Sequence, residues 1–235
     1  MIVLMYHRVN DALEPGEWVV PVARFQEQME YLRQRHRVVG PEALFPGSRS
    51  VVPGPRENRD HERPVLLTFD DGYRDNYLNA YPFLKEFRLQ ATIFLTTGYI
   101  GTDHKRPRYK DVPWRRDYLD RGEIREMRSN GIGFGAHTAT HPHLLGLDDK
   151  TIEAEVGSSR DFVAGELGME KPAFSYPYGE FDDRIRRIVR ESGFSSAYTV
   201  KPGVFHPGDD LFDIPRIGVS GTDTLDDFRK KLSWR

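Results

Sequence analysis

The 235-residue chain contains no cysteine. This absence excludes disulfide bonds, thiolate nucleophiles and metal sites built on cysteine sulfur. A metal ion held by this chain must therefore be bound by histidine, aspartate or glutamate side chains. The eight histidines are therefore candidate ligands.

The chain also lacks an excess of charge of either sign. Thirty-four lysines and arginines face 36 aspartates and glutamates, which leaves a formal net charge of -2. No overall basic field attracts nucleic acid, and we expect no nucleic-acid partner. Hydrophobic residues make up 38% of the chain and aromatic residues 12%, enough for a sizeable core. We expect a single domain over residues 1–235.

Long apolar runs are missing as well. The first residues, MIVLMYHRVND, reach a histidine and an arginine too soon for the apolar core of a signal peptide. No run is long enough to span a bilayer, so we expect no transmembrane segment. The chain as given is expected to be soluble and cytoplasmic, or periplasmic or extracellular if a leader has been removed. The sequence leaves the oligomeric state open.

Short apolar stretches alternate with amphipathic ones along the whole chain. Strands are predicted over 2–7, 64–69, 90–97, 132–137, 173–176, 195–200 and 213–219, and helices over 22–36, 77–87, 121–131, 148–168, 181–193 and 224–232. This alternation predicts an α/β fold, a distorted β/α barrel of about seven parallel strands. No glycine-rich phosphate loop follows a strand, which weighs against a nucleotide-binding fold.

Two segments interrupt the alternation. Residues 46–63 are rich in proline, glycine and arginine and predict an irregular surface loop. Residues 102–120 are charged and carry aromatic side chains. This second insertion is either a solvated loop or a lid near a polar ligand, because such loops lie at the mouths of barrels.

Polar residues that can act in catalysis or metal binding lie at the C-terminal ends of the predicted strands. These residues are His7, Asp70, Asp71, His137 and Tyr178. In a β/α barrel the C-terminal ends of the strands share one face, and the active site is built there. We therefore expect these side chains to lie at one face of the barrel.

The stretch HTATHPHL places His137 and His141 four residues apart, with His143 just beyond. Residues at this spacing share a helix face, and a tight loop can also bring the two rings together. Two imidazoles and one carboxylate are a familiar ligand set for a divalent ion. One of the paired aspartates could complete the set, leaving the other as a base. The alternatives are a polar turn with surface histidines and a strand-ending turn at the aspartates.

The motifs TFDDG, HTATHP and YPYG, in this order, resemble the polysaccharide deacetylases with a NodB-homology domain, carbohydrate esterase family 4. The resemblance implies that Asp70 is the catalytic base and that Asp71, His137 and His141 bind one divalent metal. That ion is expected to be zinc, with cobalt or nickel as alternatives. It also implies that the backbone N–H of Tyr178 stabilises the oxyanion.

The chain departs from the commonest family pattern at two places. Ser175 stands where the third motif usually has arginine, and the late L-x-x-H motif is missing. An early LMYHRV and a late DIPRIGV instead resemble the branch that acts on poly-β-1,6-N-acetylglucosamine, in which the motif order is permuted. This resemblance implies that His7 is the acid and that Arg216 orients Asp70.

The expected activity is the metal-dependent removal of N-acetyl groups from an N-acetylglucosamine-containing polysaccharide, such as an exopolysaccharide, with release of acetate. The alternatives are a deacetylase of an O-acetyl ester or a non-sugar amide, and a catalytically silent glycan-binding module. An ionised base and a protonated acid predict a bell-shaped pH–rate profile. Whether His143 or His206 contributes to the site is left open.

Overall fold

The structure is a computed structural model that describes residues 1–45, 63–102 and 117–234. Most of the two insertions predicted at 46–63 and 102–120 lies outside these described residues. The prediction of a single domain over the full chain therefore stays a prediction.

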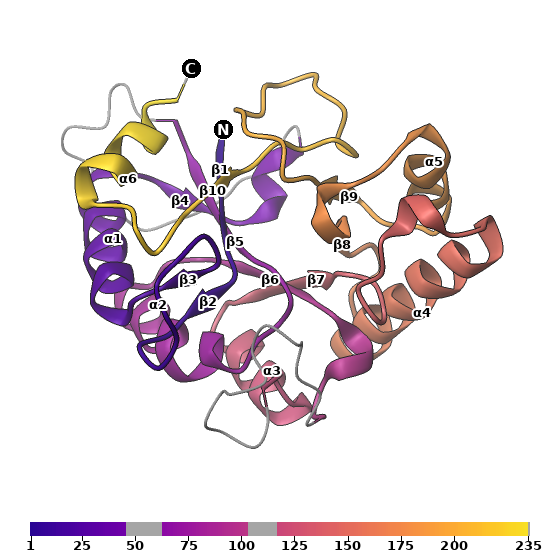
Figure 1. Cartoon of the computed structure of the whole chain (residues 1–235), viewed down its shortest axis with the longest axis horizontal. Coiled ribbons are helices and arrows are strands. Elements are labelled where there is room, and N and C mark those ends of the chain that lie inside the picture. Colours follow the sequence, from indigo (N-terminus) through magenta and orange to yellow (C-terminus); the bar gives the residue numbers. More distant parts are fainter. Residues whose placement is uncertain (46–62, 103–116, 235) are drawn as a thin grey trace.

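A curled parallel sheet forms the centre of the molecule (Figure 1). Its main strands are β1 (Ile2–Tyr6), β5 (Val65–Phe69), β6 (Thr92–Leu95), β7 (Gly133–Ala136), β8 (Ala173–Ser175), β9 (Ser196–Tyr198) and β10 (Ile217–Gly218), and the short β4 (Val38–Val39) also pairs with β5. The main strands follow the order β10-β1-β5-β6-β7-β8-β9, and all pair in parallel. A bridge from Tyr198 to Ile214 links β9 to the segment before β10. The predicted distorted barrel is confirmed.

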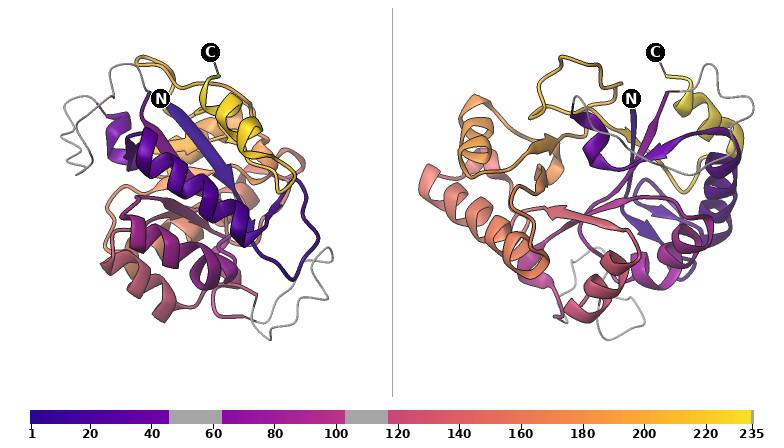
Figure 2. Two further views of the ribbon diagram at one scale, coloured as in Figure 1. Left: turned by 90° about the vertical axis from the view of Figure 1, so that its left-hand side faces the viewer. Right: turned by 180° about the vertical axis from the view of Figure 1, so that it is seen from behind.

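Helices surround this sheet (Figures 1 and 2). They are α1 (Val22–Arg35), α2 (Tyr81–Phe87), α3 (Arg121–Ser129), α4 (Asp149–Leu167), α5 (Asp183–Glu191) and α6 (Leu225–Leu232). Four of them begin at a side-chain cap, namely Asp120, Asp148, Asp182 and Thr224. Within the described part of the chain, no helix is both long enough and apolar enough to cross a membrane.

Short elements account for most differences from the sequence prediction. The predicted helix over 77–87 is two pieces, a π-helix η2 (Asn76–Ala80) followed by α2, whose first turn contains Pro82. Strands β2 (Arg8–Val9), β3 (Val19–Val20) and β4 (Val38–Val39) were not predicted. Two-residue strands carry no periodic pattern, so only their pairing identifies them.

The two central strands are buried along their whole length, and polar residues begin where they end. Every residue of β1 and β5 is buried, as expected for central strands covered on both faces. The apolar side chains end with Tyr6 on β1 and Phe69 on β5, which pair with each other. The next residues, His7 and Asp70, therefore leave the sheet side by side at its C-terminal end.

Candidate active site

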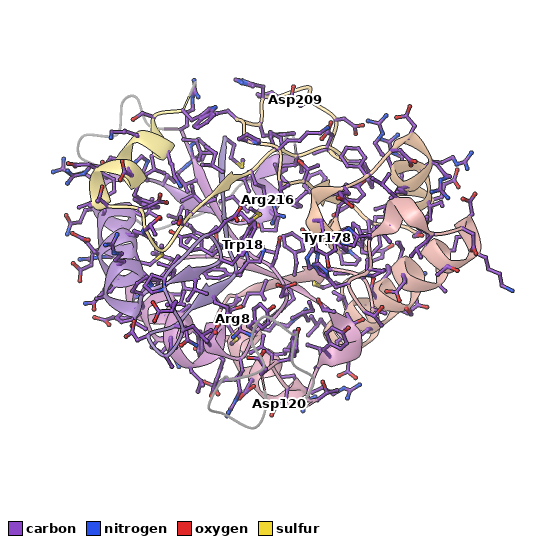
Figure 3. All side chains as sticks on the ribbon, in the orientation of Figure 1. Arg8, Trp18, Asp120, Tyr178, Asp209 and Arg216 are labelled. Atoms are coloured by element: carbon purple, nitrogen blue, oxygen red, sulfur yellow. The ribbon has the colours of Figure 1, made fainter. Side chains whose placement is uncertain are left out.

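Segments next to five strands of the sheet, β10, β1, β5, β7 and β8, supply the predicted side chains. His7 follows β1, Asp70 and Asp71 follow β5, and His137 follows β7. The motif YPYG begins after β8, where a 3-10 turn (Pro177–Gly179) follows Ser175. Arg216 precedes β10, which pairs with β1 at the other end of the strand order from β8. In Figure 3, Tyr178 and Arg216 lie over the central part of the fold, whereas Asp209 lies at its outer edge.

Asp71, His137 and His141 converge on one point. Their ligand atoms all lie within 4.8 Å of one another. Asp71 Oδ1 lies 3.7 Å from His137 Nε2 and 3.4 Å from His141 Nε2. Two ligand atoms bound about 2.1 Å from one tetrahedral ion lie about 3.4 Å apart. These three residues therefore fit a single divalent ion.

A backbone carbonyl fixes the His137 ring. The carbonyl oxygen of Ser175 lies 2.7 Å from His137 Nδ1. A carbonyl only accepts, so Nδ1 carries the proton and donates it. The lone pair of Nε2 is then left on the side that faces Asp71, which is the arrangement expected of a histidine ligand. The ring is oriented by the protein itself.

Left-handed backbone is concentrated at this site. Asp71, Thr138, His141 and Tyr178 have φ between 59° and 75°, and they are four of the five described non-glycine residues with positive φ. This conformation is costly for such residues and persists where the surroundings hold it. Here Thr138 Oγ1 accepts from the backbone N–H of His141 at 2.9 Å. A tight loop, rather than a regular helix, brings the two histidines together.

Asp70 has a different partner. Both of its oxygens accept from the Arg216 guanidinium, Oδ1 from Nη1 at 2.8 Å and Oδ2 from Nη2 at 2.7 Å. Both side chains are almost completely buried. Burial alone would raise the pKa of the Asp70 carboxyl, but the Arg216 guanidinium, together with His137 and His7, outweighs burial and holds the pKa well below its usual range. Asp70 is therefore a carboxylate at neutral pH.

Arg216 is itself held on three sides. Its Nε donates to the Thr199 carbonyl at 2.7 Å, and Nη2 donates to Ser175 Oγ at 2.8 Å. Its Nη1 also donates to Thr68 Oγ1 at 3.2 Å. Ser175, the residue at the usual arginine position, thus contacts an arginine that arrives from another strand. The geometry agrees with the predicted pairing of Arg216 and Asp70.

His7 lies half-buried at the end of β1, and its ring centroid is 4.4 Å from that of Trp18. Burial lowers the pKa of His7 to about 4, although the Asp70 and Asp71 carboxylates act in the opposite direction. The imidazole is therefore neutral at pH 7. This differs from the expectation of an acid that is already protonated at the working pH, because desolvation outweighs the two carboxylates.

Tyr178 borders the metal-ligand group. Its ring centroid lies 4.6 Å from that of His141, and 46% of the residue is exposed. The His143 ring stacks on Tyr178 at 3.7 Å, and its Nδ1 lies 3.0 Å from Glu180 Oε2. His143 is therefore engaged with neighbours of the site and does not belong to the converging ligand group.

His206 lies far from this group. The backbone N–H of its neighbour Phe205 donates to the Met1 carbonyl at 3.0 Å, at the start of β1. His7 lies at the other end of the same strand. His206 is exposed and therefore occupies the opposite end of the sheet from the candidate site.

Sequence reasoning did not assign a role to several residues that shape the site. They are Thr68, Ser175 and Thr199, which hold Arg216 or His137, and Trp18, which covers His7. Thr68 could have been noticed as the one polar residue of a fully buried strand. Trp18 lies before a two-residue strand, and no pattern in the sequence marks it.

The fold and these side chains define an α/β barrel protein with a donor set suited to one divalent ion. The pattern of the family described as "Polysaccharide deacetylase" matches residues 57–197, more than half of the chain. The chain therefore belongs to the polysaccharide deacetylase family, and it is a hydrolase with the NodB-type fold.

Individual relatives agree with this assignment. "Putative polysaccharide deacetylase YxkH" of Bacillus subtilis (strain 168) is 28% identical over 218 residues, which cover 93% of this chain and 71% of the relative. "Poly-beta-1,6-N-acetyl-D-glucosamine N-deacetylase" of Staphylococcus aureus (strain MSSA476) is 23% identical, with 93% and 78% covered. The Streptococcus pyogenes deacetylase PplD, solved in complex with acetate, shares the fold with a TM-score of 0.80 at 22% identity, with 99% and 97% covered.

Proposed function

We propose that this chain is a metal-dependent N-deacetylase that releases acetate from a polysaccharide containing β-1,6-linked N-acetylglucosamine. One observation carries the proposal: the adjacent carboxylates of Asp70 and Asp71 have separate partners at one rim of the barrel. These separate partners support a base and a metal ligand at adjacent positions of the chain. The permuted motifs and the staphylococcal relative support the substrate.

Asp71, His137 and His141 would hold the ion, which we propose is zinc, with cobalt or nickel as alternatives. When bound, a divalent ion supplies Lewis acidity, which lowers the pKa of water and polarises the acetyl carbonyl. The orientation of His137 by the Ser175 carbonyl prepares the site for the ion.

Asp70 is the proposed general base. Arg216 keeps it ionised and fixes the carboxylate plane through two parallel hydrogen bonds. The carboxylate accepts a proton from the attacking water, and its position beside Asp71 places it close to the metal group. The backbone N–H of Tyr178 is the proposed donor to the oxyanion that develops on the carbonyl oxygen.

His7 is the proposed group that protonates the departing amine. Because its ring is neutral at rest, we propose that His7 receives the proton that Asp70 has taken from the attacking water and passes it to the departing amine. Trp18 covers one side of the ring and limits its contact with water. The attacking water loses one proton and the departing amine gains one, so the proton count of the step balances.

A panel of acetylated substrates tests the proposal. Acetate release is measured from a β-1,6-linked N-acetylglucosamine oligomer, a β-1,4-linked oligomer, an O-acetyl ester and a non-sugar amide, each with zinc, cobalt or nickel. We expect the β-1,6-linked oligomer to have the highest kcat/KM. Faster release from the ester or the non-sugar amide would assign another substrate, and binding of the oligomer without acetate release would make the chain a glycan-binding module.

A further inference from the structure

The motif that contains the two aspartates continues into Asn76, whose side chain reaches the proposed acid. Asn76 is completely buried, and its Nδ2 donates to the backbone carbonyl of His7 at 2.8 Å. The carbonyl only accepts, so the orientation of the amide is fixed. Strands β1 and β5 are neighbours, and this bond joins the segments that leave them.

A π-helical turn makes this contact possible. Asn76 and Asn79 both belong to η2, and they donate at 2.8 Å to the carbonyls of His7 and Val9, respectively. On its other edge β2 pairs with β3, and the backbone N–H of Arg8 donates to the Trp18 carbonyl. The two side-chain amides thus supply hydrogen bonds that a neighbouring strand would otherwise make. Asn76 makes the one to the backbone of His7, the proposed acid. π-Helical turns are frequent at functional sites.

Buried charges anchor the residues on both sides of this bond. Arg8, which follows His7, donates at 2.8 Å to Asp75, which precedes Asn76. Arg8 also donates to Asp117 at 2.5 Å, and its guanidinium lies 3.5 Å from the centre of the Tyr73 ring. The side chains of Arg8, Asp75 and Asp117 are all fully buried. The junction between the two segments is therefore held by strong, directional contacts.

The Asn76 amide is not fully satisfied. Its Oδ1 is buried and has no hydrogen-bond partner among the described residues. An unpaired buried acceptor is unfavourable, and an apolar side chain of similar shape would avoid it. The donor side of the amide is the side that is used: Nδ2 donates to the His7 carbonyl at 2.8 Å and, at a longer distance of 3.3 Å, to Asp75 Oδ1.

We propose that Asn76 is a positioning residue for His7, fixing the backbone from which the proposed acid reaches the departing amine. This inference rests on the proposed function, in which His7 protonates the amine. It links the second half of the DDGYRDN segment to leaving-group departure, while the first half supplies the base and a metal ligand.

Two substrates separate this role from a structural one. An N-acetylglucosamine oligomer has an amine leaving group that needs a proton, whereas the nitrophenolate of 4-nitrophenyl acetate leaves without one. In Asn76→Ala, we expect kcat for the oligomer to fall about tenfold, with KM, hydrolysis of 4-nitrophenyl acetate and metal content within about twofold of the wild type. Asn76→Leu fills the same space and should behave alike if the alanine variant is unstable.

Asn79→Ala is the matched control, because it removes an equivalent hydrogen bond to the backbone carbonyl of Val9, two residues after His7. It should leave the ratio of the two activities unchanged. The inference is overturned if Asn76→Ala or Asn76→Leu lowers both activities equally or neither, or if Asn79→Ala changes the ratio as much. A wild-type chain that releases no acetate from the oligomer instead overturns the proposed function, and no variant is needed to see it.

Discussion

Asp70 and Asp71 are neighbours in the chain, but they have opposite surroundings. Asp70 has both oxygens in hydrogen bonds to one buried guanidinium. Asp71 has left-handed backbone and faces two imidazole nitrogens at 3.4 and 3.7 Å, distances that suit a shared ion better than direct hydrogen bonds. The turn between the two residues gives each carboxylate a partner of its own.

Each of the two adjacent carboxylates in this buried site has a positive group, present or proposed, to balance it. Arg216 balances the charge of Asp70, and a divalent ion would balance that of Asp71. Each balancing charge is removed by a different experiment. The two halves of the site can therefore be disabled separately, and the four predictions below run from the largest expected effect to the smallest.

Removal of the ion should have the largest effect. Chelation followed by dialysis is expected to lower acetate release about 10⁴-fold, because a metal ion contributes several kcal/mol to transition-state stabilisation. Added zinc, cobalt or nickel should restore turnover. Elemental analysis verifies that the metal is gone. Full activity of that metal-free protein would contradict the proposed metal dependence.

Replacing Asp70 should come next. Asp70→Asn keeps the size of the side chain and a hydrogen-bond acceptor for Arg216, but it removes the base. We expect kcat to fall about 10³-fold, within the range typical of general-base catalysis. Thermal unfolding serves as the control for folding. Turnover within tenfold of the wild type would place the base elsewhere.

Arg216 should control the pH at which Asp70 works. Without the guanidinium, the largest effect that opposes burial is lost, and the pKa of Asp70 rises. The base must be ionised, so the acid limb of the kcat/KM profile of Arg216→Gln should move to higher pH, with a loss of about tenfold at neutral pH. Arg216→Lys retains the charge and should shift the limb less. An unmoved limb in a folded Arg216→Gln variant would contradict the proposed pairing.

Ser175 should have the smallest effect of these. Ser175→Ala removes the hydrogen bond from Arg216 and a longer one, 3.3 Å, that Ser175 Oγ donates to Asp70 Oδ2, and it leaves the backbone carbonyl that holds His137. A bond of about 1 kcal/mol predicts a loss of about fivefold in kcat/KM with unchanged metal content. Loss of metal in this variant would show that the Ser175 hydroxyl also supports the metal-ligand group of Asp71, His137 and His141.

The sequence predicted the parts of the site that lie in contiguous motifs or at strand ends. Asp70, Asp71, His137 and His141 belong to such motifs, and the strand alternation predicted their common face of the barrel. His7 and Arg216 are separated from these motifs, and only the family resemblance indicated them. The roles of all six residues, like that of Tyr178, stay predictions.

Other features depend on contacts between distant segments. Trp18 and Asn76 act on His7 through a two-residue strand and a π-helical turn, which leave no periodic signal. The low pKa of His7 follows from burial, which a sequence pattern does not quantify. Most of the two insertions lies outside the described residues, so the proposed lid over 102–120 stays a prediction.

The most direct test of the account is the metal content of Asp70→Asn and Asp71→Asn, measured side by side by elemental analysis. His143→Ala is the matched control, because its ring is engaged with Tyr178 and Glu180 rather than with the ligand group. We predict that Asp71→Asn loses the ion, whereas Asp70→Asn and His143→Ala retain it. Equal metal content in the two aspartate variants would contradict the division of roles between Asp70 and Asp71.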